Sequence, residues 1–402
     1  MTKLTLGEFS NILSYLIDNN KTLIDKGDTP IAVCLEGEAG LGKTAVVQQL
    51  AETKGMTFVK VNLAQIEEPA ELIGFPYKEY EIIRPESEEA VWVSADLLRD
   101  MSCDYKTTGK SRMSYAVPSW VPSTENDNGT MLVLDDFSRA NSLIMQAVME
   151  LINTGSYLSW KLPKYTNIVL TSNPDNSNYS VTGLDMAQKS RFICFSGKFD
   201  IKEWASWAET FGIDSRAINF AMLYETELFK PRNGVVVANA RNYTTFCRAI
   251  SGISDWSEDS AMTTILQISS GCFLHKDNPV GIMFTQFIAD KLDKLISPEE
   301  MLNGSWDTVS KKMENSVYEN SVYKANIASI LGTRFLNYCD KCISAKRSEA
   351  KKIAARLEEI ANSEKQLLTQ DILYNIIKTI SKKHVAATNT WFLNKTLRNI
   401  TL

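Results

Sequence analysis

Residues 37–44 read Gly-Glu-Ala-Gly-Leu-Gly-Lys-Thr and match every fixed position of the phosphate-binding pattern G-x-x-x-x-G-K-[ST]. The apolar run at 31–35 before them is typical of a buried strand, and the apolar residues within 45–50 have the spacing of one helix face. Glycines in such a loop let backbone N–H groups turn inward at a helix N-terminus, where the helix dipole favours anions. The stretch therefore predicts a loop that binds a nucleoside triphosphate.

Individual residues of this loop have expected roles. Lys43 is expected to lie on the β- and γ-phosphates of ATP, as a catalytic as well as a binding residue, and the Thr44 hydroxyl is expected to bind Mg²⁺. A chance match in a glycine turn is the alternative, and the flanking strand and helix patterns weigh against it. The predicted nucleotide-binding residues of the loop are Gly37, Glu38, Ala39, Gly40, Leu41, Gly42, Lys43, Thr44 and Ala45.

A second buried-strand pattern, at 131–134, ends in two carboxylates, Asp135 and Asp136. Beside a phosphate loop, the first carboxylate can order Mg²⁺ and its water shell, and the second can polarise the attacking water. We therefore predict Asp135 as a metal ligand and Asp136 as a catalytic residue. Glutamate is usual at the second position, so the shorter Asp136 predicts slow hydrolysis. A simple Asp-Asp turn at a strand end is the alternative.

A third buried strand, at 167–170, runs into Thr-Ser-Asn-Pro at 171–174. A polar side chain at the tip of a central strand can hydrogen-bond the γ-phosphate or the attacking water. Asn173 is therefore a candidate catalytic residue that senses the phosphate. An Asn-Pro turn without further function is the alternative.

Composition narrows the class of protein. With 402 residues and 44% hydrophobic content, the chain predicts two or three globular domains. No apolar stretch approaches the roughly 20 residues that span a bilayer, and residues 1–11 lack the pattern of a signal peptide. We therefore expect a cytoplasmic protein without membrane contact. The seven cysteines suit reduced thiols, and two histidines leave little material for histidine-based metal or triad chemistry.

Charge is distributed unevenly along the chain. Residues 1–290 hold 25 basic and 36 acidic side chains, whereas residues 291–402 hold 18 and 12. Basic residues near the end, including Lys351, Lys352 and Arg356, interleave with apolar residues at helical spacing. This pattern favours a solvated helix face, and contact with nucleic acid or an acidic partner is the alternative.

Taken together, the motifs resemble those of the MoxR-like, dynein-related group of AAA+ ATPases. The resemblance covers about residues 28–290, and the chain beyond 297 matches nothing in that family. It implies an α/β fold in which an AAA+ P-loop nucleotide domain, a parallel sheet between helices with strand order 5-1-4-3-2, precedes a helical lid and a helical C-terminal extension. The stretches that carry it are 29–46, 67–76, 116–122, 131–141, 162–174 and 187–192.

The resemblance also suggests how the chain is divided. We expect an N-terminal helix that packs on the core, the nucleotide domain, the lid and a basic helical extension. Within the nucleotide domain, the family carries an insert in the second helix and a hairpin before the third motif, both directed toward a ring pore. The segment between Tyr77 and Tyr115 departs from the family and is predicted to be an elaborated, turn-rich loop. The expected domain bounds are 1–27, 28–198, 199–297 and 298–402.

Two arginines gain roles from the resemblance alone. Arg191 corresponds to the arginine that such ATPases present to the nucleotide of a neighbouring subunit, and pairing with an acid in its own subunit is the alternative. Arg241 lies where relatives carry a lid arginine that contacts the γ-phosphate of the same subunit. The usual preceding proline is missing there, and Arg232, which does follow a proline, competes for the assignment.

The expected function is MgATP hydrolysis in a homo-oligomeric ring, most simply a hexamer, that remodels, assembles or activates a protein client. By resemblance, the partner would carry a von Willebrand factor A domain. Two alternatives stay open: a nucleic-acid motor or loader that uses the basic C-terminal region, and a nucleotide-gated scaffold that binds ATP but barely hydrolyses it.

Overall fold

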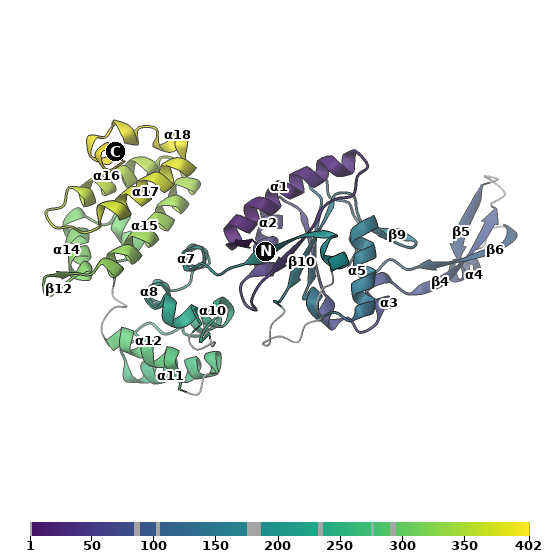
Figure 1. Ribbon diagram of the computed structural model, residues 1–402, viewed down its shortest axis with the longest axis horizontal. Helices are drawn as coiled ribbons and strands as arrows, with labels where there is room; N and C mark the ends of the chain where they lie inside the picture. The colour runs from purple at the N-terminus through teal and green to yellow at the C-terminus, as the bar shows by residue number, and fades with distance from the viewer. Residues whose placement is uncertain are drawn as a thin grey trace. The chain divides into compact units, whose positions relative to one another are not determined.

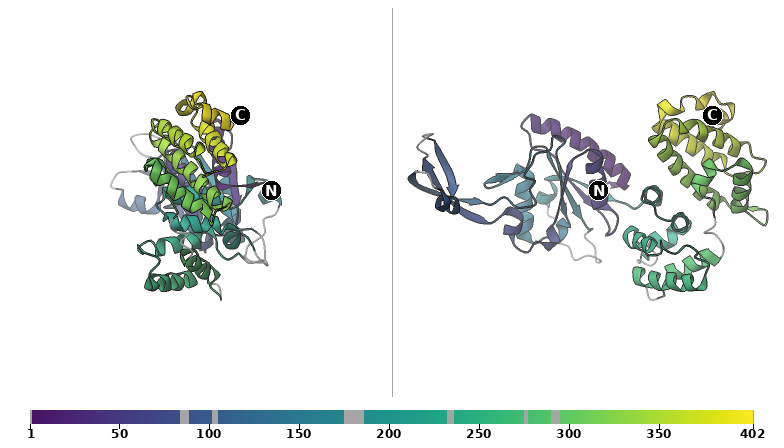
Figure 2. Two further views of the ribbon diagram at one scale, coloured as in Figure 1. Left: turned by 90° about the vertical axis from the view of Figure 1, so that its left-hand side faces the viewer. Right: turned by 180° about the vertical axis from the view of Figure 1, so that it is seen from behind.

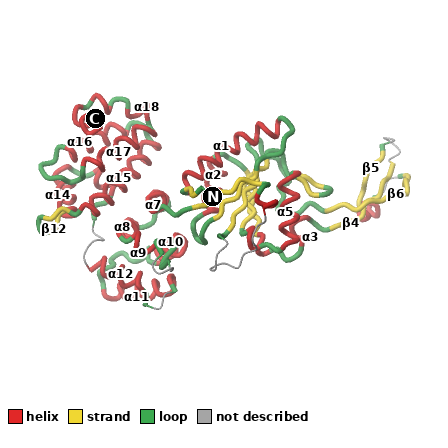
Figure 3. Tube along the Cα trace, viewed as in Figure 1, coloured by secondary structure: helices red, strands yellow, loops and turns green. Residues whose placement is uncertain are grey.

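A computed structural model describes residues 2–83, 89–101, 105–174, 186–231, 236–274, 277–289 and 295–401. The chain divides into two compact units, Met1–Lys198 and Phe199–Leu402. The first unit contains both helices and strands, whereas the second is almost entirely helical (Figures 1 and 3). The predicted fold class, an α/β nucleotide domain followed by helical regions, is confirmed.

A six-stranded sheet forms the centre of the first unit, in the order β1-β11-β2-β10-β7-β3, and every neighbouring pair is parallel. Without β1, the order in chain numbering is 5-1-4-3-2, as predicted. The short strand β1 adds an edge that the sequence patterns did not indicate. The strands are β1 (Lys3–Leu4), β2 (Ala32–Glu36), β3 (Thr57–Asn62), β7 (Thr130–Asp135), β10 (Thr166–Ser172) and β11 (Phe192–Gly197).

Helices cover both faces of this sheet (Figure 2). On one face, α1 (Leu6–Asp25) and α2 (Lys43–Thr53) pack on alternate strand residues such as Val33 and Val133. On the other face, α5 (Ser142–Thr154) packs on the residues between them. Because both faces are buried, the strands read as continuous apolar runs rather than alternating ones.

An arm, residues 76–115, occupies the segment where a loop was predicted (Figure 1). In its described part, β4 (Pro76–Ile83) pairs antiparallel with both β5 (Ala90–Ser94) and β6 (Lys106–Tyr115), and α4 (Ala95–Asp100) follows β5. The loop prediction is wrong because polar side chains pair across the strands. Glu79 accepts from Arg112 at 2.8 Å, and Glu81 lies 3.0 Å from the ammonium group of Lys110.

Shorter elements connect these parts of the first unit. The helix α3 (Pro69–Ile73) precedes the arm, and the hairpin of β8 (Ser156–Tyr157) and β9 (Trp160–Lys161) precedes β10. The hairpin touches the base of the arm, because the Tyr115 N–H donates to the Ser159 hydroxyl at 2.7 Å.

Helices make up nearly all of the second unit, and its hydrophobic core has two parts. Aromatic residues such as Phe220, Tyr243 and Phe284 form the first, and Trp204 is buried there. Aliphatic residues around α15 form the second. The elements are α7 (Ile201–Thr210), α8 (Ser215–Leu223), α9 (Glu225–Phe229), α10 (Ala240–Ala249), α11 (Asp259–Phe273), α12 (Pro279–Ala289), α13 (Pro298–Asn303), α14 (Trp306–Val317), β12 (Tyr318–Glu319), β13 (Val322–Tyr323), α15 (Ala325–Ala345), α16 (Glu349–Ala361), α17 (Gln370–Lys383), α18 (Val385–Thr388) and α19 (Lys395–Thr401).

Two arginines of the basic C-terminal region are buried. Arg356 was predicted on a solvated helix face, but only 7% of its surface is exposed and its guanidinium donates to the carbonyl oxygens of Leu302 and Gly304. The prediction holds for Lys351 and Lys352, which are exposed. Arg334 of α15 is also buried and pairs with Glu209 of α7 at 3.0 Å. Among the described residues, no helix is both long and apolar enough to cross a membrane.

Candidate nucleotide site

The phosphate loop begins where β2 ends. The Gly37 N–H donates to the carbonyl oxygen of Ser172 at 3.0 Å, which ties the loop to the end of β10. Gly40 and Gly42 have φ angles of 79° and 103°, a left-handed conformation that favours glycine. The helix α2 starts at Lys43, so the free N–H groups of its first turn lie at the loop.

The ammonium group of Lys43 lies inside this loop. It donates to the carbonyl oxygens of Gly37 at 2.6 Å and Glu38 at 3.1 Å, and to Oδ1 of Asn173 at 3.2 Å. Only 8% of the Lys43 surface is exposed. The loop thus holds a positive charge at its centre, which suits a polyphosphate anion.

Both oxygens of Asp135 have partners. Oδ1 accepts hydrogen bonds from the hydroxyl groups of Thr44, at 2.9 Å, and Thr171, and Oδ2 lies 2.7 Å from the ammonium group of Lys60. Burial by itself would raise the pKa of Asp135. The hydrogen bonds from Lys60, Thr171 and Thr44, with the charge of Lys60, outweigh burial and lower this pKa. Asp135 is therefore a carboxylate anion over the whole neutral range.

Asp136 and Asn173 are linked directly. Asp136 adopts a left-handed conformation, φ 56°, and its N–H donates to the Thr171 hydroxyl at 3.2 Å. The side-chain amide of Asn173 donates to Oδ1 of Asp136 at 3.2 Å, while the Asn173 N–H donates to the Ser138 hydroxyl at 3.3 Å. Because Asn173 also accepts from Lys43, its side-chain amide joins the phosphate loop to the aspartate pair at the carboxyl edge of the sheet.

Three residues that contribute to this site, Thr171, Ser138 and Lys60, were not predicted as site residues. Thr171 and Ser138 hold Asp135, Asp136 and Asn173 in place. Lys60 is the single charged residue among the apolar residues at 58–61. A charge in such a run is unusual and could have marked Lys60 as a candidate site residue. The donor set fits a hard cation, since the hydroxyl of Thr44 and the carboxylate of Asp135 are oxygen ligands of the kind Mg²⁺ prefers.

The structure does not bring Arg191 to this loop. Arg191 is exposed and directly precedes β11, after the short helix α6 (Met186–Lys189). Phe192 is paired with Ala32, at the amino end of β2, whereas the phosphate loop follows the carboxyl end of β2. At roughly 3.3 Å per residue, the two edges of these strands are about 13 Å apart, beyond the reach of an arginine side chain.

Arg241 lies in the first turn of α10, in the second unit, and its predicted contact with the nucleotide stays a prediction. Arg232, the competing arginine, lies outside the described residues. The helix α10 has a capping box formed by Asn239 and Asn242, so a helix start without proline is well satisfied there.

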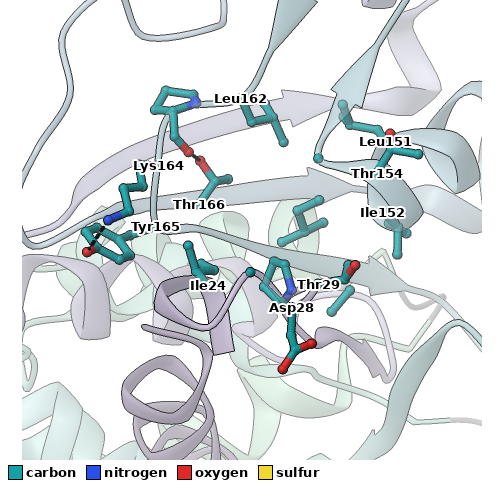
Figure 4. Close-up of a pocket in the computed structure, with 16 residues that line it drawn as sticks. Ile24, Asp28, Thr29, Leu151, Ile152, Thr154, Leu162, Lys164, Tyr165 and Thr166 are labelled. Carbon is teal, nitrogen blue, oxygen red and sulfur yellow. Dashed lines mark hydrogen bonds between the residues drawn. The ribbon is translucent and has the colours of Figure 1, made fainter. Parts of the chain in front are cut away.

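A separate cavity of about 300 Å³ lies at the amino edge of the sheet, near the starts of β2 and β10 (Figure 4). Lys164 and Tyr165 line it, and both bond to Asp25 at the end of α1, the Tyr165 hydroxyl at 2.6 Å. None of the predicted site residues lines this cavity. The nucleotide residues and this cavity therefore occupy opposite edges of the sheet.

A parallel sheet of this order, with a phosphate loop after its first long strand and paired aspartates after the third, defines a P-loop nucleotide domain of the AAA+ type. Residues 32–192 match the family model of the AAA domain, dynein-related subfamily.

Comparison with other proteins adds little beyond the family. A search of curated proteins finds no match. Among solved structures, the RuvB Holliday junction branch migration motor of Thermotoga maritima is 13% identical, with a TM-score of 0.33 over 88% of this chain and 84% of that one. A point mutant of RuvB from Thermotoga maritima is 14% identical, with a TM-score of 0.33 over 92% and 90% of the two chains. Likenesses with TM-scores under 0.5 say nothing about activity or partners.

Proposed function

We propose that this protein binds MgATP and hydrolyses it in a ring of identical subunits, and that it uses the energy to remodel a protein client. The observation that carries the proposal is the hydrogen-bonded set formed by Lys43, Thr44, Asp135, Asp136 and Asn173 at one edge of the sheet. Three sequence motifs, spread over residues 37–173, meet there.

Each side chain has a role that its contacts support. Lys43, at the centre of the loop, would bind the β- and γ-phosphates, and the loop N–H groups would bind the rest of the polyphosphate. Mg²⁺, when bound between Thr44 and Asp135, would offset charge on the phosphate oxygens. Asp136 would accept a proton from the attacking water, and Asn173, already bonded to Asp136, would orient that water.

Arg191 would act on the nucleotide of a neighbouring subunit. It lies at the amino edge of the sheet, about 13 Å along the strands from its own loop. An exposed guanidinium at that edge can reach a phosphate only across a subunit boundary. This geometry supports the predicted ring, for which six subunits remain the number that the MoxR-like resemblance suggests.

The client and the location remain proposals by resemblance. MoxR-like ATPases act as assembly or activation chaperones with partners that carry a von Willebrand factor A domain, and we propose the same class of partner in the cytoplasm. Residues 199–297 would be the lid, with Arg241 directed to the γ-phosphate, and residues 298–402 would be an extension. The ion pair of Arg334 with Glu209 would make lid and extension move together.

The first test measures ATP hydrolysis by the wild type and by the Lys43→Ala variant. Turnover should fall at least about a hundredfold, because the ammonium group supports charge that develops on the transferred phosphate. Lys54→Ala is the matched control, since Lys54 lies away from the site and pairs with the exposed Asp18 at 2.8 Å. Wild-type turnover in the Lys43→Ala variant would refute the site.

The second test separates the client classes. An Asp136→Asn variant should hold ATP without hydrolysis and keep the ring on its client in a pull-down. A specific protein that is lost when Lys43 is also replaced would support remodelling. Nuclease-sensitive DNA or RNA would instead favour a nucleic-acid motor. Several lysines of the C-terminal region already pair with acids, such as Lys383 with Asp340 at 2.6 Å, which weighs against that alternative.

A further inference from the structure

Asp135, the carboxylate proposed to bind Mg²⁺, already lies beside a positively charged side chain of the protein. Oδ2 of Asp135 lies 2.7 Å from the ammonium group of Lys60, on the neighbouring strand β3. Lys60 and Asp135 project from the same face of the sheet, the face covered by α2, because strand residues two positions apart share a face. Lys60 is therefore in the right place to hold this oxygen whenever the metal is not there.

The two oxygens of Asp135 differ in their partners. Oδ1 accepts from the hydroxyl groups of Thr44 and Thr171, both neutral donors, whereas Oδ2 faces the charged ammonium group of Lys60. The Asp135 side chain is 14% exposed and the Lys60 side chain 43%. This lysine can thus swing into solvent at little cost, while the Asp135 carboxylate is held by the hydroxyl groups of Thr44 and Thr171.

We propose that Lys60 is a positioning residue that competes with Mg²⁺ for Asp135 and so sets the Mg²⁺ concentration at which the protein binds ATP. The inference rests on the proposed function and names how its site is regulated. In the absence of metal, Lys60 holds Asp135 in place and offsets its charge. When MgATP arrives, the divalent ion replaces the ammonium group at Asp135, so metal binding is coupled to the release of Lys60.

The test is the Mg²⁺ dependence of ATP binding, measured with a fluorescent ATP analogue in Mg²⁺ titrations of the full chain. Lys60→Gln keeps a hydrogen-bond donor for Asp135 but removes the charge. It should lower the Mg²⁺ concentration for half-maximal binding by roughly five- to tenfold. Affinity at saturating Mg²⁺ should stay within about twofold of wild type, because Lys60 has left the carboxylate in that state.

Two further variants make the test specific. Lys60→Arg retains the charge and should restore the wild-type Mg²⁺ dependence, which a merely structural role of the side chain would not require. Lys54→Gln removes a lysine paired with the exposed Asp18 and should change nothing. Melting temperatures of all variants without nucleotide report whether each one folds.

The outcomes are distinguishable. An unchanged Mg²⁺ midpoint in a folded Lys60→Gln variant overturns the competition and leaves the proposed function intact. Weaker ATP binding at every Mg²⁺ concentration also overturns it, because Lys60 would then contact phosphate directly. If the wild type binds no ATP with Mg²⁺, the proposed function fails and this inference fails with it.

Discussion

Replacement of Arg334 by methionine should destabilise the second unit strongly. Only 2% of the Arg334 surface is exposed, and its guanidinium donates to Glu209 at 3.0 Å and to Asn219 at 2.9 Å. Burial raises the pKa of Glu209, despite the opposing charge of Arg334, and burial lowers the pKa of Arg334. Desolvation therefore disfavours the charged form of both side chains, and each is stabilised by the opposite charge of the other.

The magnitude follows from what the variant leaves behind. Removal of one partner of a buried ion pair costs about 3–5 kcal/mol. Glu209 can limit its part of that cost by taking up a proton, which at pH 7 requires about 3.4 kcal/mol for a carboxyl of ordinary pKa near 4.5. We therefore expect a loss of about 3–4 kcal/mol at pH 7, with the lost hydrogen bond to Asn219 included.

The assay is urea unfolding followed by tryptophan fluorescence, because five of the eight tryptophans lie in residues 199–402. With an m-value of about 2–3 kcal/mol/M, the midpoint of the second unit should fall by about 1.5 M. The double variant Arg334→Met with Glu209→Gln removes the isolated charge and should recover at least about 2 kcal/mol.

The pH dependence provides an independent check with a fixed sign. In the Arg334→Met variant the pKa of Glu209 is higher in the folded state than in the unfolded state. As the pH rises, Glu209 therefore loses its proton in the unfolded state first. The deficit is therefore fully present at neutral pH and shrinks as the pH falls toward the unfolded value near 4.5. A loss under about 1 kcal/mol at pH 7, or a deficit that does not shrink by pH 5, would refute the reasoning.

Three further predictions concern the first unit. Asp136→Glu should raise the ATPase rate several-fold, since the carboxylate gains one methylene of reach; equal or lower turnover, measured with saturating MgATP, would contradict the view that Asp136 slows hydrolysis. Cys194 lies opposite Cys34 on neighbouring strands, and a hydrogen bond from that thiol lowers the pKa of Cys194 to about 7. Alkylation of Cys194, followed by mass spectrometry, should therefore reach half its maximal rate near pH 7, and Cys34→Ala, which removes the donor, should move that midpoint toward the ordinary value of about 8.5; an unmoved midpoint would exclude the thiol contact as the cause. Gly74→Ala should cost at least about 2 kcal/mol and expose the arm to limited proteolysis, because φ is +89° and a Cβ atom would lie 1.7 Å from the carbonyl oxygen of Ala116. Wild-type stability and proteolysis would show that the base of the arm opens without strain.

The sheet and its order could be predicted because buried parallel strands leave long apolar runs in the sequence. The pattern at 31–35 overlaps β2 with a shift of one residue, the pattern at 131–134 lies within β7, and Asp135 lies at the very end of β7. The arm could not be predicted in the same way. Its longest strand, β6, is short of apolar residues, and Glu79 and Glu81 are paired by Arg112 and Lys110 of that strand, about thirty residues away.

Buried arginines show the same limit in the second unit. Arg356 falls in an amphipathic pattern, and charge alone assigns it to the solvated side. Its guanidinium instead finds carbonyl oxygens at Leu302 and Gly304, at the end of α13. A helix C-terminus leaves carbonyl groups without intrahelical partners, so a buried cation is favourable there. Nothing in the sequence of α16 indicates that Arg356 has these carbonyl oxygens as partners.

The same distinction explains which part of the nucleotide site was predicted. Asp135, Asp136 and Asn173 follow buried strands, and in a parallel sheet all such residues gather at one edge, whatever the details of packing. Their location therefore follows from topology. The partner of a side chain does not, because it depends on register: Lys60 reaches Asp135 only because Asn62 and Asp135 are aligned, which leaves Lys60 two residues away on the same face. A shift of one residue would turn Lys60 to the opposite face and remove the competition with Mg²⁺, so the metal dependence of the site is a property of the strand register rather than of any motif.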